Sequence, residues 1–510
     1  MPTMASPLPD DPSTLKAMLI AERARARRLE EIIKAMQRHR FGRRAETLSE
    51  DQLLLGLEDV EQTVSASEAA DESTVPAKRA DVAAKRRANR GALPPHLPRI
   101  EILHDLDDKS CPCCRGLLHQ IGEDRSERLD IVPAQFRVLV TCRPRYACRT
   151  CEDVVIQAPA PARLIEGGLP TEATIAQVLV SKFADHLPLY RQAQIYARQG
   201  VRLDRSTLAD WVGRAAFHLR PIHERLLAIL RTSPKLFADE TTAPVLDPGR
   251  GRTKTGQFWT YARDDRPWGG LDPPAVVYVY APDRKAARPI DHLADFHGIL
   301  QVDGYAGYRK LAEGNAVTLA FCWAHVRRRF YELANAGSAP IASEALARIA
   351  ELYRVEADIR GRSAEARRVA RREKSKPVLD ALEPWLRDKL LTISQKTKLA
   401  EAIRYALSRW DGLCRFLDDG RIEIDSNIVE RAIRPIALTR KNALFAGSDG
   451  GAETWAIIAS LIECCKLVDV EPYAYLTDAI TRIVNGHLNN KLDQLLPWTY
   501  RPTPAPIHVV

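Results

Sequence analysis

The hydrophobic pattern is most informative between residues 421 and 447, where apolar positions recur at helical spacing. Asp425 and Ser426 are common residue types at a helix N-cap, so the segment that follows predicts a helix. One face of that helix carries Ile428, Val429, Ala432, Ile433 and Ile436. Glu430 lies early in it, followed by the cations Arg431, Arg434, Arg440 and Lys441. A carboxylate among cations is expected where a divalent metal and a phosphate backbone are bound together. The alternative is a solvated amphipathic helix with surface ion pairs.

Two strand-like segments upstream each carry acidic residues. Residues 235–246 form a β-rich run with Asp239 and Glu240 in its middle, and residues 298–308 open with a short apolar run that ends in Asp303. Carboxylates from two strands and a later helix can converge on a pair of hard cations, because such cations prefer oxygen ligands. Asp239, Asp303 and Glu430 therefore predict a phosphoryl-transfer site.

Strand and helix patterns alternate around these acids. Further strands are predicted at residues 257–264, 275–280 and 316–322, and helices at residues 286–296 and 323–330. The helix at 323–330 is basic and contains His325, a candidate for contact with DNA or a scissile phosphate. A structural histidine beside Trp323 is the alternative.

Helical patterns also fill two longer stretches. Residues 170–231 predict three helices, with a break at Gly200. A short turn followed by an Arg/Ser/Thr-headed helix is compatible with helix-turn-helix recognition of DNA, and also with any three-helix packing unit. Residues 332–419 predict a helical subdomain inserted between the second acid and the third. Its basic run at residues 360–374 is either a DNA-facing surface or a solvated helix face.

The amino-terminal pattern is different. A mostly apolar set of positions, weakened by Glu22 and Ala26, recurs at alternating steps of four and three: Leu15, Leu19, Glu22, Ala26, Leu29, Ile33 and Met36. This spacing predicts a short coiled coil, or else an amphipathic helix packed on its own chain. Residues 58–98 shift to Glu, Ser and Ala and then to Lys and Arg, with few aliphatic residues, and so predict a linker.

Four cysteines give the strongest local signal for a metal. Cys111 with Cys114, and Cys148 with Cys151, form two C-x-x-C pairs, and each pair can present two thiolates to one tetrahedral zinc. A redox or free-thiol pair is the alternative, but no thioredoxin-like pattern surrounds them. Because four cysteines complete the coordination shell, the predicted zinc is structural and not catalytic.

Composition and charge narrow the class of partner. A chain of 510 residues with 45% hydrophobic residues is long enough for several domains. Lys+Arg 75 against Asp+Glu 66 gives a net charge of +9, which favours a polyanionic partner. There is no apolar run long enough to span a bilayer, and the amino-terminal segment is unlike a signal peptide. Ten cysteines in so long a chain are not a disulfide framework, so we expect a cytosolic protein.

A family resemblance rests on four segments: FADETTAPV, QVDGYAGYRKL, CWAHVRRRF and DSNIVERAIRPIALTRKNALFAGSDGGAE. They closely resemble the DDE transposases of the insertion sequence 66 family, and the resemblance covers most of the chain. It implies an acidic triad at Asp239, Asp303 and Glu430 that holds two Mg²⁺ ions. The implied activity is cleavage at the ends of a bacterial insertion sequence and joining of the 3′-hydroxyls to target DNA. Two alternatives stay open: a ribonuclease-H-like nuclease without strand transfer, and a catalytically inactive zinc-dependent DNA-binding protein.

The resemblance also implies partners. They are DNA, as terminal inverted repeats and as target, and accessory proteins of the same element; no membrane is involved, and the expected location is the bacterial cytoplasm with the nucleoid. Because two element ends must be joined to one target, we expect a homo-oligomer on DNA. The candidate DNA-binding residues are Arg431, Arg434, Arg440, Lys441, His325, Arg327 and Arg328.

The expected fold class is multidomain α+β. The expected order is a helix or coiled coil (1–57), a linker (58–98), a zinc-binding β module (99–160), a helical, helix-turn-helix-like domain (161–232), a ribonuclease-H-like catalytic α/β core (233–330 and 421–451) interrupted by a helical insertion (331–420), and carboxy-terminal helices with a tail (452–510).

Overall fold

The computed structural model describes residue 11 and residues 135–147, 155–166, 168–247, 252–313 and 317–501. The chain forms two compact units, Met1–Pro133 and Ala134–Val510, and all described residues except residue 11 belong to the second. The predicted coiled coil, linker and zinc-binding cysteines lie outside the described residues. A helix with the length and apolar composition of a membrane span does not occur in the described ranges.

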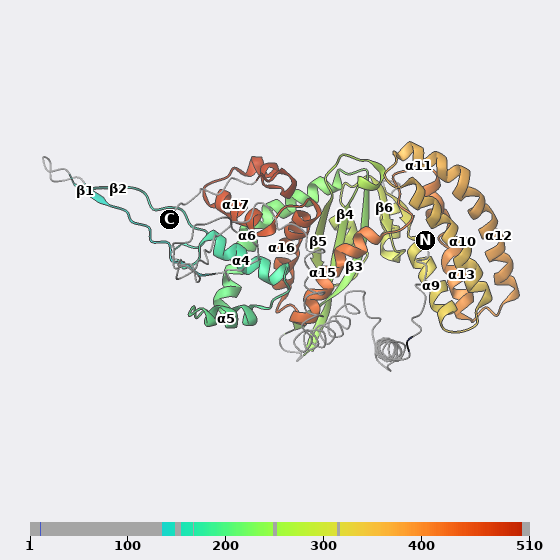
Figure 1. Cartoon of the computed structure of the whole chain (residues 1–510), viewed down its shortest axis with the longest axis horizontal. Helices are drawn as coiled ribbons and strands as arrows, with labels where there is room; N and C mark the ends of the chain where they lie inside the picture. Colours follow the sequence, from blue (N-terminus) through green and yellow to red (C-terminus); the bar gives the residue numbers. More distant parts are fainter. Residues whose placement is uncertain are drawn as a thin grey trace, which may run out of the picture. The chain divides into compact units, whose positions relative to one another are not determined.

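A mixed five-stranded sheet forms the centre of the second unit (Figure 1). Its strands are β3 (Lys235–Asp247), β4 (Arg252–Arg263), β5 (Ala275–Ala281), β6 (Gly298–Val302) and β7 (Val317–Phe321). The spatial order is β5-β4-β3-β6-β7. Strand β4 is antiparallel to both of its neighbours, β3 and β5, whereas β6 and β7 run parallel to β3. Aromatic and β-branched residues, which favour strands, fill its buried positions. The strands predicted from the sequence are confirmed.

The three helices predicted between residues 170 and 231 are confirmed. They are α4 (Glu172–Phe183), α5 (Leu189–Arg198) and α6 (Arg205–Arg231). Thr171 caps α4, because its hydroxyl accepts a hydrogen bond from the Thr174 N–H at 3.2 Å. After the sheet come α15 (Asn427–Ala443), α16 (Asp449–Leu467) and α17 (Pro472–Val484). Helix α16 packs against β5 (Figure 1), and its buried side chains share one core with α4, α6 and the sheet.

The free edge of β5 is covered by side chains of helices. The Tyr278 N–H donates to Ser460 Oγ at 2.8 Å, and the Val276 N–H donates to Cys464 Sγ at 3.3 Å. The Cys464 thiol donates back to the Val276 carbonyl at 3.2 Å, and His223 of α6 donates from Nε2 to the Tyr278 carbonyl at 2.9 Å. These bonds replace the neighbouring strand that an edge strand lacks.

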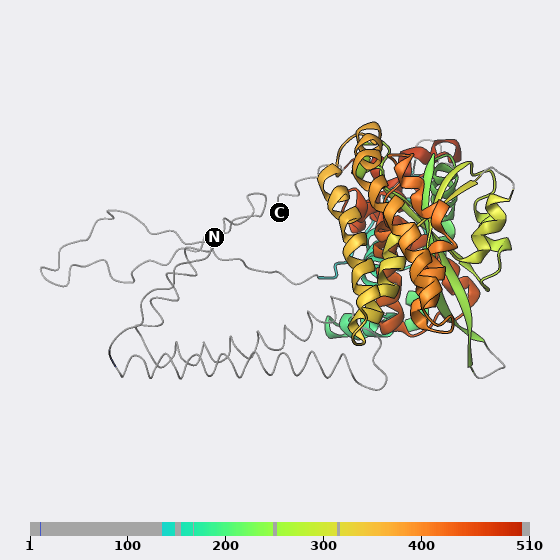
Figure 2. The ribbon, with the colours of Figure 1, turned by 90° about the vertical axis from the view of Figure 1, so that its right-hand side faces the viewer.

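The helical insertion has a second hydrophobic core. Its helices are α9 (Trp323–Asn335), α10 (Pro340–Ile359), α11 (Ala364–Ala370), α12 (Lys376–Thr392), α13 (Lys398–Leu407) and α14 (Trp410–Cys414), with the π-helical turn η3 (Arg371–Ser375) between α11 and α12. They stack beside one another next to β6 and β7 (Figures 1 and 2). The stretch between the second acid and the third is therefore helical, as its pattern predicts.

Two expectations are corrected. The basic run at residues 360–374 is neither wholly DNA-facing nor wholly solvated, because Arg367 and Arg371 are fully buried. Glu356 and Glu423 pair with them and make that burial possible. The helix predicted at residues 286–296 is shorter, Ala287–His292, because Leu293 leaves the helical conformation with a φ of −107° and a ψ of 26°.

The shorter described elements are β1 (Arg145–Ala147), β2 (Val155–Gln157), α7 (Ala287–His292), α8 (Arg309–Ala312) and the 3₁₀ turns η1 (Arg266–Trp268), η2 (Ala306–Tyr308), η4 (Arg415–Leu417), η5 (Asn489–Leu495) and η6 (Pro497–Thr499).

Candidate active site

Asp239 and Asp303 occupy matching positions on two neighbouring parallel strands. Strands β3 and β6 pair with Phe237 opposite Gln301. Two residues further along come Asp239 on β3 and Asp303 directly after β6. Residues two apart share a face of a strand, and these strands run in the same direction. The sheet therefore brings the first two predicted acids together.

Glu240, the next acid on β3, lies on the opposite face because side chains alternate along a strand. Its carboxylate pairs with Arg284, whose Nε donates at 2.8 Å, and Tyr308 donates its hydroxyl at 3.0 Å. The Arg284 guanidinium also lies 4.1 Å from the ring centroid of Tyr305. Glu240 is thus already neutralised, and Asp239 is the β3 carboxylate that remains for another ligand.

The charge of Asp239 is poorly compensated. Burial, together with the like charges of Glu240, Asp303 and then Glu430, raises the pKa of Asp239 to about 7. The Glu240 N–H donates to Asp239 Oδ1 at 2.8 Å and opposes this shift. Carboxylates held near one another disfavour the ionised state unless a cation lies among them. The three predicted acids therefore form one electrostatic cluster.

The turn after β6 is held by the helical insertion. Tyr405 of α13 donates its hydroxyl to the Asp303 carbonyl at 2.6 Å, and Arg409 donates to the Gly304 carbonyl at 3.2 Å. The guanidinium groups of Arg329 and Arg409 lie 4.0 and 3.9 Å from the Tyr405 ring centroid. Gly304 has a φ of +100°, and a Cβ there would lie 2.4 Å from Arg409 Nε, so the position requires glycine.

Side chains of two strands of the sheet hold the loop before α15. Gln301 donates from Nε2 to the carbonyls of Glu423 and Asp425 at 2.7 and 3.1 Å. The buried Lys235 donates from Nζ to the Arg421 carbonyl at 2.8 Å. Burial lowers the pKa of Lys235 to about 8, while Glu423 favours its charged form. These contacts fix the point at which α15 begins.

The start of α15 confirms one of the two predicted capping residues. Asp425 Oδ1 accepts a hydrogen bond from the Asn427 N–H at 3.2 Å. Ser426 occupies the N-cap position but makes no capping hydrogen bond with its side chain. Its N–H instead donates to Cys322 Sγ at 3.2 Å. The first turn of α15, which carries Glu430, is therefore joined to the start of α9.

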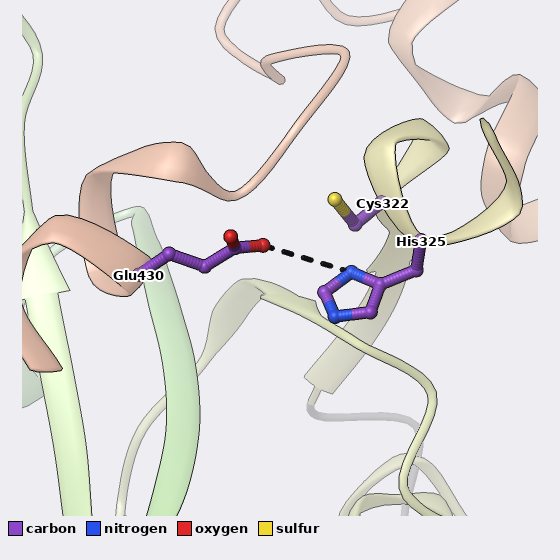
Figure 3. A group of neighbouring side chains, drawn as sticks. All are labelled: Cys322, His325 and Glu430. Atoms are coloured by element: carbon purple, nitrogen blue, oxygen red, sulfur yellow. Dashed lines mark ion pairs between the residues drawn. The ribbon is translucent and has the colours of Figure 1, made fainter. Parts of the chain in front are cut away.

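Glu430 projects from α15 toward α9 (Figure 3). Its Oε1 lies 3.8 Å from His325 Nδ1, and its Oε2 lies 3.8 Å from Arg328 Nη2. Arg440, which the sequence places near Glu430, lies at the other end of α15 and donates to Thr241 Oγ1 at 2.9 Å. The expectation that the cations of α15 surround Glu430 is therefore wrong for Arg440, and α9 supplies two of the partners of Glu430.

Two buried atoms in this cluster lack hydrogen-bond partners within the described part of the chain: Glu430 Oε1 and His325 Nδ1. Their separation of 3.8 Å is too long for a hydrogen bond. Burial lowers the pKa of His325, although Glu430 and Asp303 favour its charged form. A buried carboxylate oxygen without a partner, beside two further carboxylates, fits a hard divalent cation.

Cys322 lies beside the same pair (Figure 3), and one ligand atom from each of Cys322, His325 and Glu430 falls within 4.8 Å of the others. Its Sγ already accepts the Ser426 N–H. Burial raises the pKa of Cys322 to about 11, so the thiol is neutral at pH 7. Cys322 thus holds the start of α15 through the Ser426 N–H, and the nearby carboxylates supply the oxygen donors that suit a hard cation.

The predicted DNA-binding residues divide into two sets. Arg431, Arg434 and Lys441 lie on the exposed side of α15, and Arg327 and Arg328 on the exposed side of α9. His325 faces Glu430, and Arg440 binds β3. Several residues that hold the acids were not singled out from the sequence: Lys235, Gln301, Tyr405 and Arg409. Only Gly304, directly after an acidic strand end, gave a local signal of a close approach.

Comparison with known proteins identifies the class. The family described as "Transposase IS66 family" matches residues 167–454, which include all three acids. Three further descriptions match other parts: "Transposase C of IS166 homeodomain" at 28–102, "zinc-finger binding domain of transposase IS66" at 108–152, and "IS66 C-terminal element" at 460–498. The chain belongs to the IS66 transposase family. The zinc-finger match encloses Cys111, Cys114, Cys148 and Cys151 and supports a zinc site there.

Three relatives come from Sinorhizobium fredii. The uncharacterized protein y4jD is 46% identical, with 97% of each chain covered. The uncharacterized protein y4qI is 44% identical, with 97% of this chain and 98% of the relative covered. The uncharacterized protein y4hP is 37% identical, with 94% of this chain and 89% of the relative covered.

Proposed function

We propose that this protein cleaves the ends of a bacterial insertion sequence and joins the freed 3′-hydroxyls to target DNA, with Asp239, Asp303 and Glu430 as its catalytic acids. The observation that carries the proposal is their convergence: two acids at matching positions of parallel strands, and a third on α15 with a buried oxygen that lacks a hydrogen-bond partner among the described residues. Membership of a transposase family supplies the substrate class, DNA.

The three acids would hold two Mg²⁺ ions. When bound, such a pair supplies Lewis-acid stabilisation to the attacking and leaving oxygens of an in-line phosphoryl transfer. The chain supplies the rest. Gln301 and Lys235 fix the loop before Glu430, and Tyr405 and Arg409 fix the turn of Asp303. The exposed Arg431, Arg434, Arg327 and Arg328 would bind phosphates beside the acids, and Lys441 would bind a phosphate further along α15. His325 would stay near Glu430 and orient its carboxylate.

The same proposal assigns the sheet to a ribonuclease-H-like core. Three antiparallel strands followed by two parallel ones, with the first acid on the first strand in sequence and the second directly after the fourth, support that assignment. The proposed working form is a homo-oligomer on DNA, in the bacterial cytoplasm with the nucleoid, assisted by accessory proteins of the same element. One structural Zn²⁺ would be held by the four cysteines, Cys111, Cys114, Cys148 and Cys151.

A strand-transfer assay tests the proposal. Purified full-length protein is incubated with Mg²⁺, a labelled duplex of its element's end, and a plasmid target. The expected products are a nick at the 3′ end of the element and a joined product of higher mass. Nicking without joined product would favour the nuclease alternative. Binding without nicking would favour the catalytically inactive DNA-binding alternative.

A further inference from the structure

The segment directly after α15 has a strained backbone. Leu444 adopts a φ of 64° and a ψ of −48°, and the Phe445 N–H donates to the Ala443 carbonyl at 2.7 Å. This is a γ-turn with positive φ at its centre, a rare and strained conformation. Glycine or asparagine would adopt it more easily than leucine.

The surrounding contacts hold this turn in place. On the helix side, Arg440 donates to Thr241 Oγ1 at 2.9 Å, and Asn442 donates to the His186 carbonyl at 3.1 Å. On the other side, the Ala446 N–H donates to the Pro244 carbonyl at 2.9 Å, and the Leu246 N–H donates to the Ala446 carbonyl at 2.8 Å. Strain of this kind persists only where the structure enforces it, and it concentrates at functional sites.

The turn exposes its apolar side chains. Leu444 is 66% exposed, Phe445 is 41% exposed, and Leu246 on the adjoining strand is 38% exposed. We call these three residues the apolar tip. Burial in the chain's own core therefore does not account for a leucine at a strained position. An apolar group presented in this way is suited to contact with another molecule.

The charged residues beside the apolar tip indicate what kind of molecule the tip contacts. Arg431, Arg434 and Lys441 follow the exposed side of α15 at spacings that keep them on one face, and Arg252 is exposed on β4, paired with Asp247 next to Leu246. Leu444 lies fourteen positions after Glu430, about 21 Å along a helix that rises about 1.5 Å per residue. At about 3.4 Å per base pair this is roughly six base pairs of duplex.

We propose that the apolar tip inserts into the base stack of the element's DNA, about six base pairs from the phosphate at the acids, and unstacks a base step there. Apolar side chains wedged between base steps, next to cations on phosphates, are an established way to kink a duplex. The proposal rests on the proposed function, since the acids define where the cleaved phosphate lies. It assigns the tip to positioning the DNA and not to the chemistry.

The test uses a duplex of the element's end with 2-aminopurine placed singly at each position from four to eight base pairs from the cleavage site. Full-length wild-type protein should raise its fluorescence at one position, because unstacking relieves quenching. Leu444→Gly and Phe445→Ser should lose that rise. Their dissociation constants for the duplex should change by less than about tenfold, because phosphate contacts supply most of the affinity. Leu271→Gly is the matched control, since Leu271 is 99% exposed in a loop away from the tip.

The outcomes separate this inference from the proposed function. Unstacking by a wild-type protein that never cleaves the duplex would support the tip and overturn the proposed chemistry. Cleavage without a fluorescence rise at any position, or an equal rise with Leu444→Gly, would overturn the tip. A loss of self-association or of accessory-protein binding in Leu444→Gly, with unstacking retained, would show that the tip binds protein and would also overturn it. A thermal midpoint of Leu444→Gly no lower than wild type excludes misfolding as the cause.

Discussion

Two buried clusters of charged residues in this protein differ in how their charges are arranged. In the helical insertion, Arg371 forms a bidentate ion pair with Glu356, with hydrogen bonds of 2.8 and 2.7 Å, and donates to the Phe416 carbonyl at 2.9 Å. At the sheet, Asp239, Asp303 and Glu430 place like charges together, and Glu430 Oε1 lacks a hydrogen-bond partner within the described residues. The first, the complete cluster, pairs each guanidinium with a carboxylate and serves the fold, although Arg367 Nε has no hydrogen-bond partner among the described residues. The second, the incomplete cluster, holds like charges close together, as expected of a sequence that preserves a binding site at the expense of local stability.

The two clusters are also connected. Arg367 donates to Glu423 Oε1 at 2.7 Å, and the Glu423 carbonyl accepts a hydrogen bond from Gln301. Glu423 belongs to the loop that leads into α15 and so to Glu430. The insertion is therefore a support for the third acid as well as a spacer between the second acid and the third.

The largest effect is expected from breaking the complete cluster. Arg371→Met leaves the Glu356 carboxylate buried without its main partner, and should lower the free energy of unfolding by about 3–5 kcal/mol. Chemical denaturation measures it. Arg372→Met is the matched control, because the Arg372 pair with Asp418 is exposed and should contribute less than about 1 kcal/mol. Equal losses in the two variants would refute the distinction between buried and exposed pairs.

The next largest effect is expected on DNA cleavage when an acid of the incomplete cluster is replaced. Asp239→Asn, Asp303→Asn and Glu430→Gln should each reduce DNA cleavage by at least about a hundredfold, because each removes a charged metal ligand with little change in shape. Binding to the element's end should be largely retained, as measured by gel shift. Glu240→Gln is the informative comparison, since Glu240 is paired with Arg284. If Glu240→Gln abolished cleavage and Asp239→Asn did not, the metal ligand on β3 would be Glu240.

A smaller effect is expected from a buried group that is neutral in the folded state. Burial lowers the pKa of His223 to about 4, against about 6.5 in an unfolded chain. Between these values the unfolded chain binds more protons, so the stabilisation is fully present above pH 6.5 and is lost as the pH falls toward 4. Lowering the pH from 8 to 5 should remove about 2 kcal/mol through this residue.

His223→Gln, which retains a donor for the Tyr278 carbonyl, should reduce that loss in a series of denaturation curves, and His297→Gln, at an exposed site, should not. His292 keeps part of the pH dependence in both variants, because burial also lowers its pKa to about 4. An unchanged pH dependence in His223→Gln would show that the His223 ring is solvated.

Periodicity predicted most of the fold, because strands and helices in this unit are long and strongly patterned. The acids Asp239, Asp303 and Glu430 were found from their places within a strand, at a strand end and in an early helical turn, together with the family resemblance. The burial of Arg367 and Arg371 was not predicted, because a basic run has the same appearance whether solvated or paired, and Glu423, a partner of Arg367, is distant in sequence. The strained turn at Leu444 was missed for a similar reason: no glycine or asparagine marks it.

The smallest effect is the stability of the incomplete cluster itself. Without divalent metal, Asp239→Asn should melt above wild type, by about 1 kcal/mol in the free energy of unfolding, because it removes one of several like charges. Added Mg²⁺ should stabilise wild type and leave the variant nearly unchanged, since ligand binding to the folded state raises stability. The order of the two melting curves should therefore reverse between EDTA and Mg²⁺. A variant that melts below wild type in EDTA would mean that Asp239 is stabilised by its surroundings in the metal-free protein, and that the contrast between the two clusters does not hold.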